Sequence, residues 1–219
     1  MSEIDAKKRI KNKYYREFLD TGIIRYIQPE DFDKAINNIK GRQQKAGRAI
    51  LIMLYYTGAR PTEVLKIRAR DIERQRNYVK IMLRTAKSGR ARVLYFLCGR
   101  DKYMVELVEY AKCFMPDVLI FHQFVGKYHR KVKTKAGKII ERIDTTDKLR
   151  YHIKKWFAAS MDDPVPPYFL RHNRLSRLAS TGATDRQLMQ FKGARSFESI
   201  EPYIHYSEFE AKKLAKKIK

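Results

Sequence analysis

The sequence contains little cysteine, little histidine and no long apolar segment. Its 219 residues include two cysteines, Cys98 and Cys113, which are too few for a disulfide scaffold and lack the spacing of a zinc site. Five histidines without a His/Cys cluster argue against a structural metal, so we expect neither a metal nor another cofactor. No apolar run approaches the roughly 18 residues that span a bilayer, and the N-terminal residues lack the apolar core of a signal peptide. These features predict a cytoplasmic protein.

Acidic residues are scarce relative to basic ones. Lys and Arg total 48 against 24 Asp and Glu, which gives a formal net charge of +24. Such a field attracts polyanions through counterion release and opposes self-association. Nucleic acid is the first partner to consider, and an anionic membrane surface is the second. Because the basic residues are spread along the chain rather than gathered on one amphipathic helix, we expect nucleic acid and no membrane.

Hydrophobic spacing predicts an α+β chain that is mainly helical. A helix begins near Pro29, and the apolar stretch 49–56 is typical of a buried helix that Gly58 ends with a left-handed cap. At 78–97 the period changes to that of a hairpin with its tip at 86–90. The remaining expectations are a polar link at 42–47, a basic loop at 126–137, and helices near 1–26, 61–67, 101–114, 146–161, 170–180, 186–192 and 208–219.

Four short pieces of the chain carry candidate chemistry. They are Thr57-Gly58-Ala59-Arg60 with Glu63 and Leu65, then Lys87 at the predicted hairpin tip, then Leu170-Arg171-His172, and finally Gly193 with Tyr203 ten residues later. Gly182 lies eleven residues after Arg171, and Gly193 lies eleven after Gly182. In this order and spacing the pieces resemble the catalytic domain of the tyrosine recombinases, the phage-integrase-like site-specific DNA recombinases. The resemblance covers about residues 45–210.

The resemblance implies a role for each of these side chains. Tyr203 would attack a DNA phosphodiester to form a 3′-phosphotyrosine, and Lys87 would protonate the leaving 5′-oxygen. Arg60 and Arg171 would bind the scissile phosphate, because guanidinium is planar, always charged and able to bind two oxygens at once. A phenol with a pKa near 10 needs a base or a positive field to ionise at pH 7. No metal takes part in this chemistry.

Two positions differ from the family pattern. Tyr168 stands three residues before the second arginine, where His or Lys is usual, and Ala194 stands where His or Trp follows the motif glycine. Tyr168 is either an auxiliary hydrogen-bond donor or a core aromatic residue. Arg195 either supplies the missing donor or is a plain phosphate contact or surface charge. Tyr206 is the alternative nucleophile, and the identity of the base stays open.

Other basic residues are expected to hold the duplex. The predicted loop at 126–137 is rich in Lys and Arg and contains no acid, which favours a contact with phosphates over a merely solvated loop. The predicted helix at 170–180, which contains the second motif arginine, carries two more arginines. The predicted DNA-binding set is Lys127, Arg130, Lys131, Lys133, Lys135, Arg174 and Arg177.

The resemblance also implies a domain layout and partners. We expect residues 1–44 to be a basic helical extension in which the core-binding domain is absent or truncated, and residues 45–219 to be the catalytic domain with a basic tail. Its fold would be the tyrosine-recombinase catalytic fold, with a small antiparallel sheet carrying the lysine. The expected partner is double-stranded DNA of a nucleoid, virus, plasmid or other mobile element, bound by a protein that is monomeric in solution and tetrameric on DNA.

Three alternatives to an active recombinase stay open at this point. Tyr168 and Ala194 are compatible with a catalytically degenerate relative that only binds DNA. A type IB topoisomerase would share the phosphotyrosine chemistry. An unrelated basic protein that binds RNA or ribosomes would share the charge but not the spacing of the four pieces.

Overall fold

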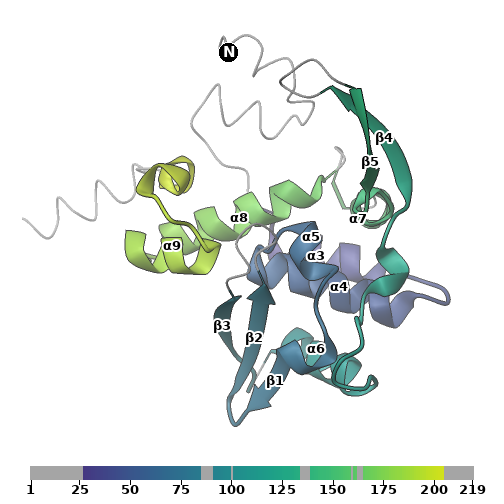
Figure 1. Cartoon of the computed structure of the whole chain (residues 1–219). Coiled ribbons are helices and arrows are strands. Elements are labelled where there is room, and N and C mark those ends of the chain that lie inside the picture. Colours follow the sequence, from purple (N-terminus) through teal and green to yellow (C-terminus); the bar gives the residue numbers. More distant parts are fainter. Residues whose placement is uncertain are drawn as a thin grey trace, which may run out of the picture. The chain divides into compact units, whose positions relative to one another are not determined.

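The computed structural model describes residues 27–84, 91–99, 101–133, 139–158, 160–161 and 165–204. These residues fall into two compact units, residues 27–171 and residues 172–204 (Figure 1). Helices predominate in both units, and the strands all lie in the first unit, which confirms the α+β prediction. In the described part of the chain no helix combines the length and the apolar character that crossing a membrane requires.

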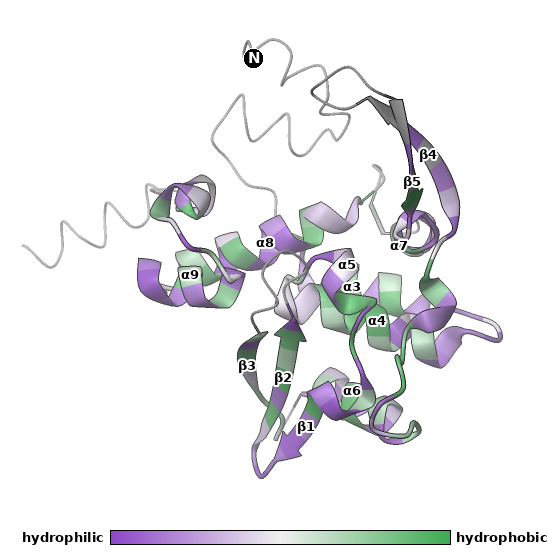
Figure 2. Ribbon diagram, in the orientation of Figure 1, coloured by the Kyte–Doolittle hydropathy of each residue, from purple (hydrophilic) through white to green (hydrophobic). Residues whose placement is uncertain are grey.

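The core of the first unit is built around α4 (Gln44–Thr57). Residues 49–54 are fully buried, as their uninterrupted apolar run predicts, and Figure 2 shows α4 as hydrophobic over much of its length. Helix α6 (Lys102–Lys112) packs on α4, while α3 (Pro29–Asn37) packs on α7 (Asp147–Phe157). The predicted link at 42–47 is wrong at its end, since α4 already begins at Gln44.

An antiparallel three-stranded sheet flanks these helices. Its order is β1 (Ile72–Gln75), β2 (Tyr78–Arg84) and β3 (Ala91–Leu97). Alternate residues of β2 and β3 point into the core, which confirms the predicted hairpin, and Tyr78 pairs with Leu97. The hairpin tip, with Lys87, lies outside the described residues. The predicted elements did not include β1, because Glu73, Arg74 and Gln75 are exposed and carry no alternating pattern.

The predicted basic loop at 126–137 is instead part of a second hairpin. Strands β4 (Tyr128–Lys133) and β5 (Ile139–Asp144) pair antiparallel with each other, and the register places Arg130 opposite Arg142. Basic residues occupy both faces of β4, since Arg130 and Lys131 are adjacent, and this interrupts the alternation that Tyr128 and Val132 would otherwise give. In Figure 1 the hairpin projects from the first unit at the end opposite the three-stranded sheet.

Short elements connect these parts of the first unit. They are α5 (Pro61–Val64), which follows α4 directly, and the 3₁₀ turns η1 (Ala69–Asp71) and η2 (His122–Phe124). The side chains of Val64, Leu65 and Ile67 are buried, as predicted.

Helix α8 (Pro167–Ser180) runs through the boundary between the two units. It begins three residues before the predicted start at 170, since proline is tolerated at the first position, where its missing N–H has no partner in the helix. The second unit continues with α9 (Asp185–Lys192) and the 3₁₀ turns η3 (Phe197–Ser199) and η4 (Glu201–Tyr203). The helices predicted at 1–26 and 208–219 lie outside the described residues.

Candidate active site

The turn between α4 and α5 places Arg60. Thr57 is buried and its hydroxyl donates to the Met53 carbonyl at 2.5 Å, while the same oxygen accepts the Ala59 N–H at 3.1 Å. Gly58 has a φ of 54°, the left-handed conformation in which a glycine costs least, and its N–H bonds the Leu54 carbonyl. The Thr-Gly pair therefore ends α4 and fixes the direction in which the chain delivers Arg60.

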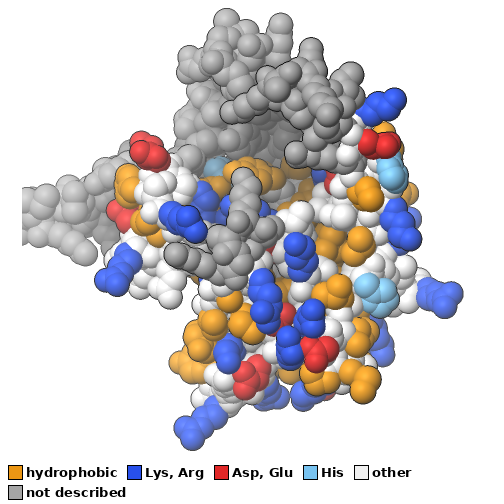
Figure 3. Space-filling model, viewed as in Figure 1, with side chains coloured by type: hydrophobic (Ala, Val, Ile, Leu, Met, Phe, Trp, Pro, Cys, Tyr) orange, Lys and Arg blue, Asp and Glu red, His pale blue; other side chains and the backbone are white. Residues whose placement is uncertain are grey.

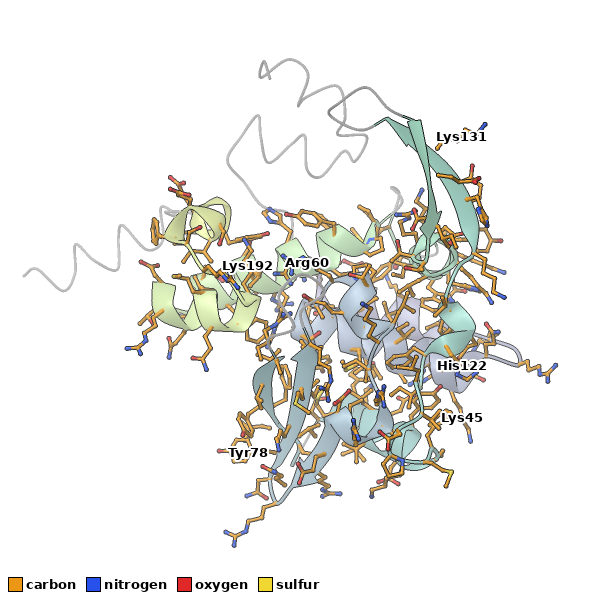
Figure 4. All side chains as sticks on the ribbon, in the orientation of Figure 1. Lys45, Arg60, Tyr78, His122, Lys131 and Lys192 are labelled. Carbon is orange, nitrogen blue, oxygen red and sulfur yellow. The ribbon has the colours of Figure 1, made fainter. Side chains whose placement is uncertain are left out.

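Glu63 holds the guanidinium of Arg60 from the first turn of α5. Arg60 Nη1 lies 2.9 Å from Glu63 Oε1, and the Arg60 backbone N–H donates to Oε2 at 3.0 Å. Glu63 is fully buried, but 49% of the Arg60 side chain is exposed. Arg60 is thus tied at one edge and open to solvent over about half of its surface, which leaves donors of its guanidinium available for a phosphate (Figure 4).

A second arginine, Arg92 on β3, completes the ion pair beneath Arg60. Its Nη2 and Nη1 donate to the two Glu63 oxygens at 2.9 and 3.3 Å, and its side chain is 6% exposed. Burial acts to raise the pKa of Glu63, but Arg92 and then Arg60 outweigh it and hold that pKa below its ordinary value. The sequence interpretation missed Arg92. The feature that could have identified Arg92 is its position in the strand, because it alternates with the buried Leu94 and Phe96 and so faces the core.

Arg171 reaches the same turn from α8. Its side chain is buried, and Nη1 donates to the Gly58 carbonyl at 2.7 Å. Gly58 lies two residues before Arg60, so the first unit brings the two predicted arginines together around one turn. Two guanidinium groups so placed can bind the non-bridging oxygens of a single phosphate.

The second unit carries Tyr203 on η4. Its side chain is 3% exposed, and its ring centroid lies 4.9 Å from that of His172. Lys192, at the end of α9, places Nζ 4.7 Å from the centroid of the Tyr203 ring and also donates to the Ser199 carbonyl. Gly193 ends α9 with a φ of 70° and begins the segment that leads to Tyr203. Lys192 was not among the predicted residues, and its place beside the motif glycine is the signal that could have identified it.

The auxiliary candidates are divided between the two units. Tyr168, in the first turn of α8, is 59% exposed, so it is not a core aromatic residue. Arg195 is exposed in the second unit, and Ala194 beside it donates its N–H to the Met189 carbonyl at 2.8 Å. Lys87 and Tyr206 lie outside the described residues. The structure therefore gives the constellation as two halves, the arginines with Tyr168 in residues 27–171 and Arg195 with Tyr203 in residues 172–204.

The predicted DNA-binding residues lie on two elements. Lys127 and Lys131 are exposed at and near the start of β4, where Figure 4 labels Lys131. Arg174 and Arg177 are half-buried on α8, and the Arg174 guanidinium lies 5.6 Å from the Phe191 ring centroid. Figure 3 shows Lys and Arg distributed over the visible face rather than gathered in one patch. The rest of the set comprises Arg130 and Lys133 within β4, and Lys135 outside the described residues.

No metal site is apparent within these described ranges. They contain no group of three His, Cys, Asp or Glu side chains able to hold an ion.

Comparison with known proteins identifies the family that shares this arrangement. The family model of the phage integrase family matches residues 25–209. Tyrosine recombinase XerD of Staphylococcus epidermidis is 23% identical over 169 residues, which cover 76% of this chain and 52% of the relative. XerD of Listeria innocua is 22% identical over 172 residues, covering 77% of this chain and 53% of the relative. The chain thus spans about half the length of these curated relatives.

Solved structures share the fold at low sequence identity. The XerH recombinase in its post-cleavage complex with palindromic difH substrate gives a TM-score of 0.62 at 14% identity, covering 87% of this chain and 52% of that chain. The catalytic domain of bacteriophage HP1 integrase gives a TM-score of 0.52 at 16% identity, covering 87% of this chain and 93% of that domain. The fold is therefore that of a tyrosine recombinase catalytic domain, as predicted.

Proposed function

Because the chain belongs to the phage integrase family, we propose that it cleaves and rejoins double-stranded DNA as a site-specific tyrosine recombinase. The observation that carries the proposal is the hydrogen bond from Arg171 to the Gly58 carbonyl, which sets the second motif arginine against the turn that carries the first. A degenerate DNA-binding relative would have no need to retain a half-exposed arginine tied by a buried carboxylate.

Arg60 and Arg171 would hold the scissile phosphate. The phosphorus becomes five-coordinate in the transition state and its non-bridging oxygens gain negative charge, so preorganised cationic donors bind that state more tightly than the ground state. Each such donor is commonly worth about 3–4 kcal/mol. Glu63 and Arg92 keep Arg60 in position through bonds of 2.9 Å on each side of the buried carboxylate.

Tyr203 would supply the nucleophile. Its phenol oxygen forms a bond to phosphorus as the bond from phosphorus to the 5′-oxygen breaks, and the phenol loses its proton. Lys192 lies 4.7 Å from the ring centroid, and its charge stabilises the negative charge that develops on the phenol. The His172 ring packs against the Tyr203 ring at an interplanar angle of 56° and would orient it.

The leaving 5′-oxygen needs a proton, which we assign to Lys87. The exposed phenol of Tyr168 would donate a hydrogen bond at the position where relatives of this pattern carry His or Lys. Arg195 would replace the donor that Ala194 lacks. The proton balance closes when the phenol proton passes to solvent or a nearby base and Lys87 protonates the 5′-oxygen.

The remaining basic residues would hold the duplex. The β4–β5 hairpin supports this role, because Lys127 just before β4 and Lys131 within it are exposed. Exposed basic side chains of this kind bind the phosphates of a DNA backbone. The residues that we propose to contact the duplex are Lys127, Arg130, Lys131, Lys133, Lys135, Arg174 and Arg177.

The organisation of the protein around this activity is also a proposal. Residues 45–219 would form the catalytic domain and residues 1–44 a basic extension. The protein would be a monomer in solution, where its charge of +24 opposes association, and a tetramer on two duplexes. It would act in the cytoplasm on nucleoid, viral or plasmid DNA.

The test is formation of a covalent adduct with a nicked duplex that traps the cleaved state. We expect the wild-type protein to give an adduct on a denaturing gel and Tyr203→Phe to give none while it retains DNA binding. Absence of an adduct from the wild type, together with tight salt-sensitive DNA binding, would favour the degenerate relative. Binding of RNA without DNA would reject the proposal altogether.

A further inference from the structure

A cavity of about 360 Å³ opens in the first unit between the end of α3, the start of α4 and the last turns of α7. Arg60, Arg171 and Tyr203 are not among the described residues that line it. Its lining residues are Asn38, Ile39, Lys40, Arg42, Gln43, His152, Lys155 and Trp156.

The charge of this cavity is of one sign. Lys40, Arg42 and Lys155 are exposed, and none of them forms an ion pair with a described residue. No carboxylate is among the described residues that line the cavity. A second cavity of the same unit, about 510 Å³, contains Asp101 as well as Lys102. The smaller cavity therefore concentrates positive charge that the fold leaves uncompensated within the described residues.

The pKa of His152 is affected by the same positive charges. Burial lowers the pKa of its imidazole, and the charges of Lys148 and Lys155 lower it further. The ring is thus neutral at pH 7, so it can donate or accept a hydrogen bond without adding charge. Its centroid lies 5.5 Å from that of Trp156.

The wall of the cavity is formed by close packing. The Asn38 amide donates to the carbonyls of Lys155 and Trp156 at 3.4 and 3.2 Å, and so joins the end of α3 to the end of α7. Gly47, in the first turn of α4, lies so near Trp156 that a Cβ built there would be 3.0 Å from the indole. Helices α3, α4 and α7 are therefore closely packed here, so the cavity exists without a ligand to form it.

We propose that this cavity is an anion site that takes a phosphate group. Arg and Lys are the usual phosphate ligands, the first through its planar fork and the second as a point charge. The volume of about 360 Å³ falls within the range of about 300–1,000 Å³ in which ligand pockets occur. The phosphate is either a backbone phosphate of bound DNA or a soluble phosphate. The first source rests on the proposed function, whereas anion binding by itself does not.

Trp156 makes the proposal testable, because it is the only tryptophan of the chain and it lines the cavity. Inorganic phosphate is titrated at constant ionic strength while the tryptophan fluorescence is followed. We expect a saturable change with phosphate and none with sodium chloride. The double variant Lys40→Gln/Arg42→Gln should weaken the apparent affinity at least tenfold, and Lys155→Gln alone should weaken it less.

The control removes two charges elsewhere on the same unit. Lys102→Gln/Lys112→Gln should leave the titration unchanged, since both residues lie on α6 and neither lines this cavity. Circular dichroism of all variants checks that they are folded. A fluorescence change that does not saturate, or that is the same in both double variants, would overturn the anion site.

A short blunt-ended duplex distinguishes the two sources. Saturation of the Trp156 signal by duplex, weakened in Lys40→Gln/Arg42→Gln, identifies a backbone phosphate; a response to phosphate alone identifies a soluble anion. Either outcome supports the site, and no response to either probe contradicts it. Failure of the wild-type protein to form a covalent adduct would count against the proposed recombinase activity. It would not affect the phosphate titration, so a failure of the proposed function can be distinguished from a failure of the anion site.

Discussion

The two units hold their functional side chains by different means. In residues 27–171, Arg60 and Arg171 are fixed by directional bonds to Glu63 and to the Gly58 carbonyl. In residues 172–204, the contacts of Tyr203 on its 3₁₀ turn include those of its ring with His172 and Lys192. Charged hydrogen bonds specify distance and angle closely, whereas ring contacts tolerate small displacements.

This difference matches the proposed division of labour. Donors that stabilise a transition state must be fixed before the reaction, because their benefit is lost if they reorganise. A nucleophile that becomes covalently attached to DNA has to accommodate the movement of the atom to which it is bound. We infer that the first unit supplies fixed geometry for the phosphate and that the second supplies the attacking group.

The largest expected effect follows from removing the ion pair beneath Arg60. Arg92→Leu leaves the buried Glu63 with the half-exposed Arg60 as its remaining ion-pair partner among the described residues, and loss of one member of a buried pair typically costs about 3–5 kcal/mol. Chemical denaturation should show that loss, and the double variant Arg92→Leu/Glu63→Leu should recover part of it. A change below about 1 kcal/mol would mean that this pair does not hold the first unit together.

Substitution of Arg171 tests the fixed geometry directly. Arg171→Ala removes a phosphate donor and the bond to the Gly58 carbonyl, so single-turnover adduct formation should fall by a factor of about 100–1,000. Arg171→Lys keeps the charge but not the fork and should recover only part of the rate. Equal rates for Arg171→Lys and the wild type would show that charge alone is sufficient at this position.

A smaller effect is expected at the ring contact of the second unit. Lys192→Met keeps much of the side-chain volume but removes the charge near Tyr203, and the rate of adduct formation should fall about tenfold. The pH–rate profile should move to higher pH, since the phenol then loses its proton less readily, and Lys192→Arg should restore it. An unchanged profile with a reduced rate would assign Lys192 a structural role only.

The smallest expected effect is the loss of folding stability at acidic pH. The pKa of Glu63 is lowered in the folded state by Arg92 and Arg60 against the opposing effect of burial. A carboxylate with a lowered folded-state pKa contributes stability above its unfolded pKa, which is about 4.3 for glutamate, and loses it as the pH falls further. Unfolding free energies measured from pH 6 to pH 3 should fall accordingly. Glu63→Gln should have a shallower dependence on pH, and identical slopes would remove Glu63 from this explanation.

Much of the first unit could be predicted from the sequence because its signals are local. A left-handed cap at Gly58 follows from glycine between an apolar run and a proline-started helix, and β2 and β3 follow from alternation. The motif spacing also singled out Arg60 and Arg171, which the structure brings to one turn.

What could not be predicted depends on contacts between distant segments. Strand β1 exists because it pairs with β2, and its own residues carry no pattern. The β4–β5 hairpin could not be predicted because the adjacent Arg130 and Lys131 interrupt the apolar–polar alternation of β4. Arg92 is 29 residues from Glu63, so no spacing rule connects them. Lys192 becomes significant only when the turn after Gly193 brings Tyr203 back over it.

The identity of the residue that becomes attached to DNA tests the central claim most directly. The adduct with nicked DNA is digested with nuclease and trypsin, and the peptide of residues 196–212, which carries both Tyr203 and Tyr206, is fragmented in a mass spectrometer. The account predicts a nucleotide on Tyr203. A nucleotide on Tyr206, or on a residue outside this peptide, would contradict it.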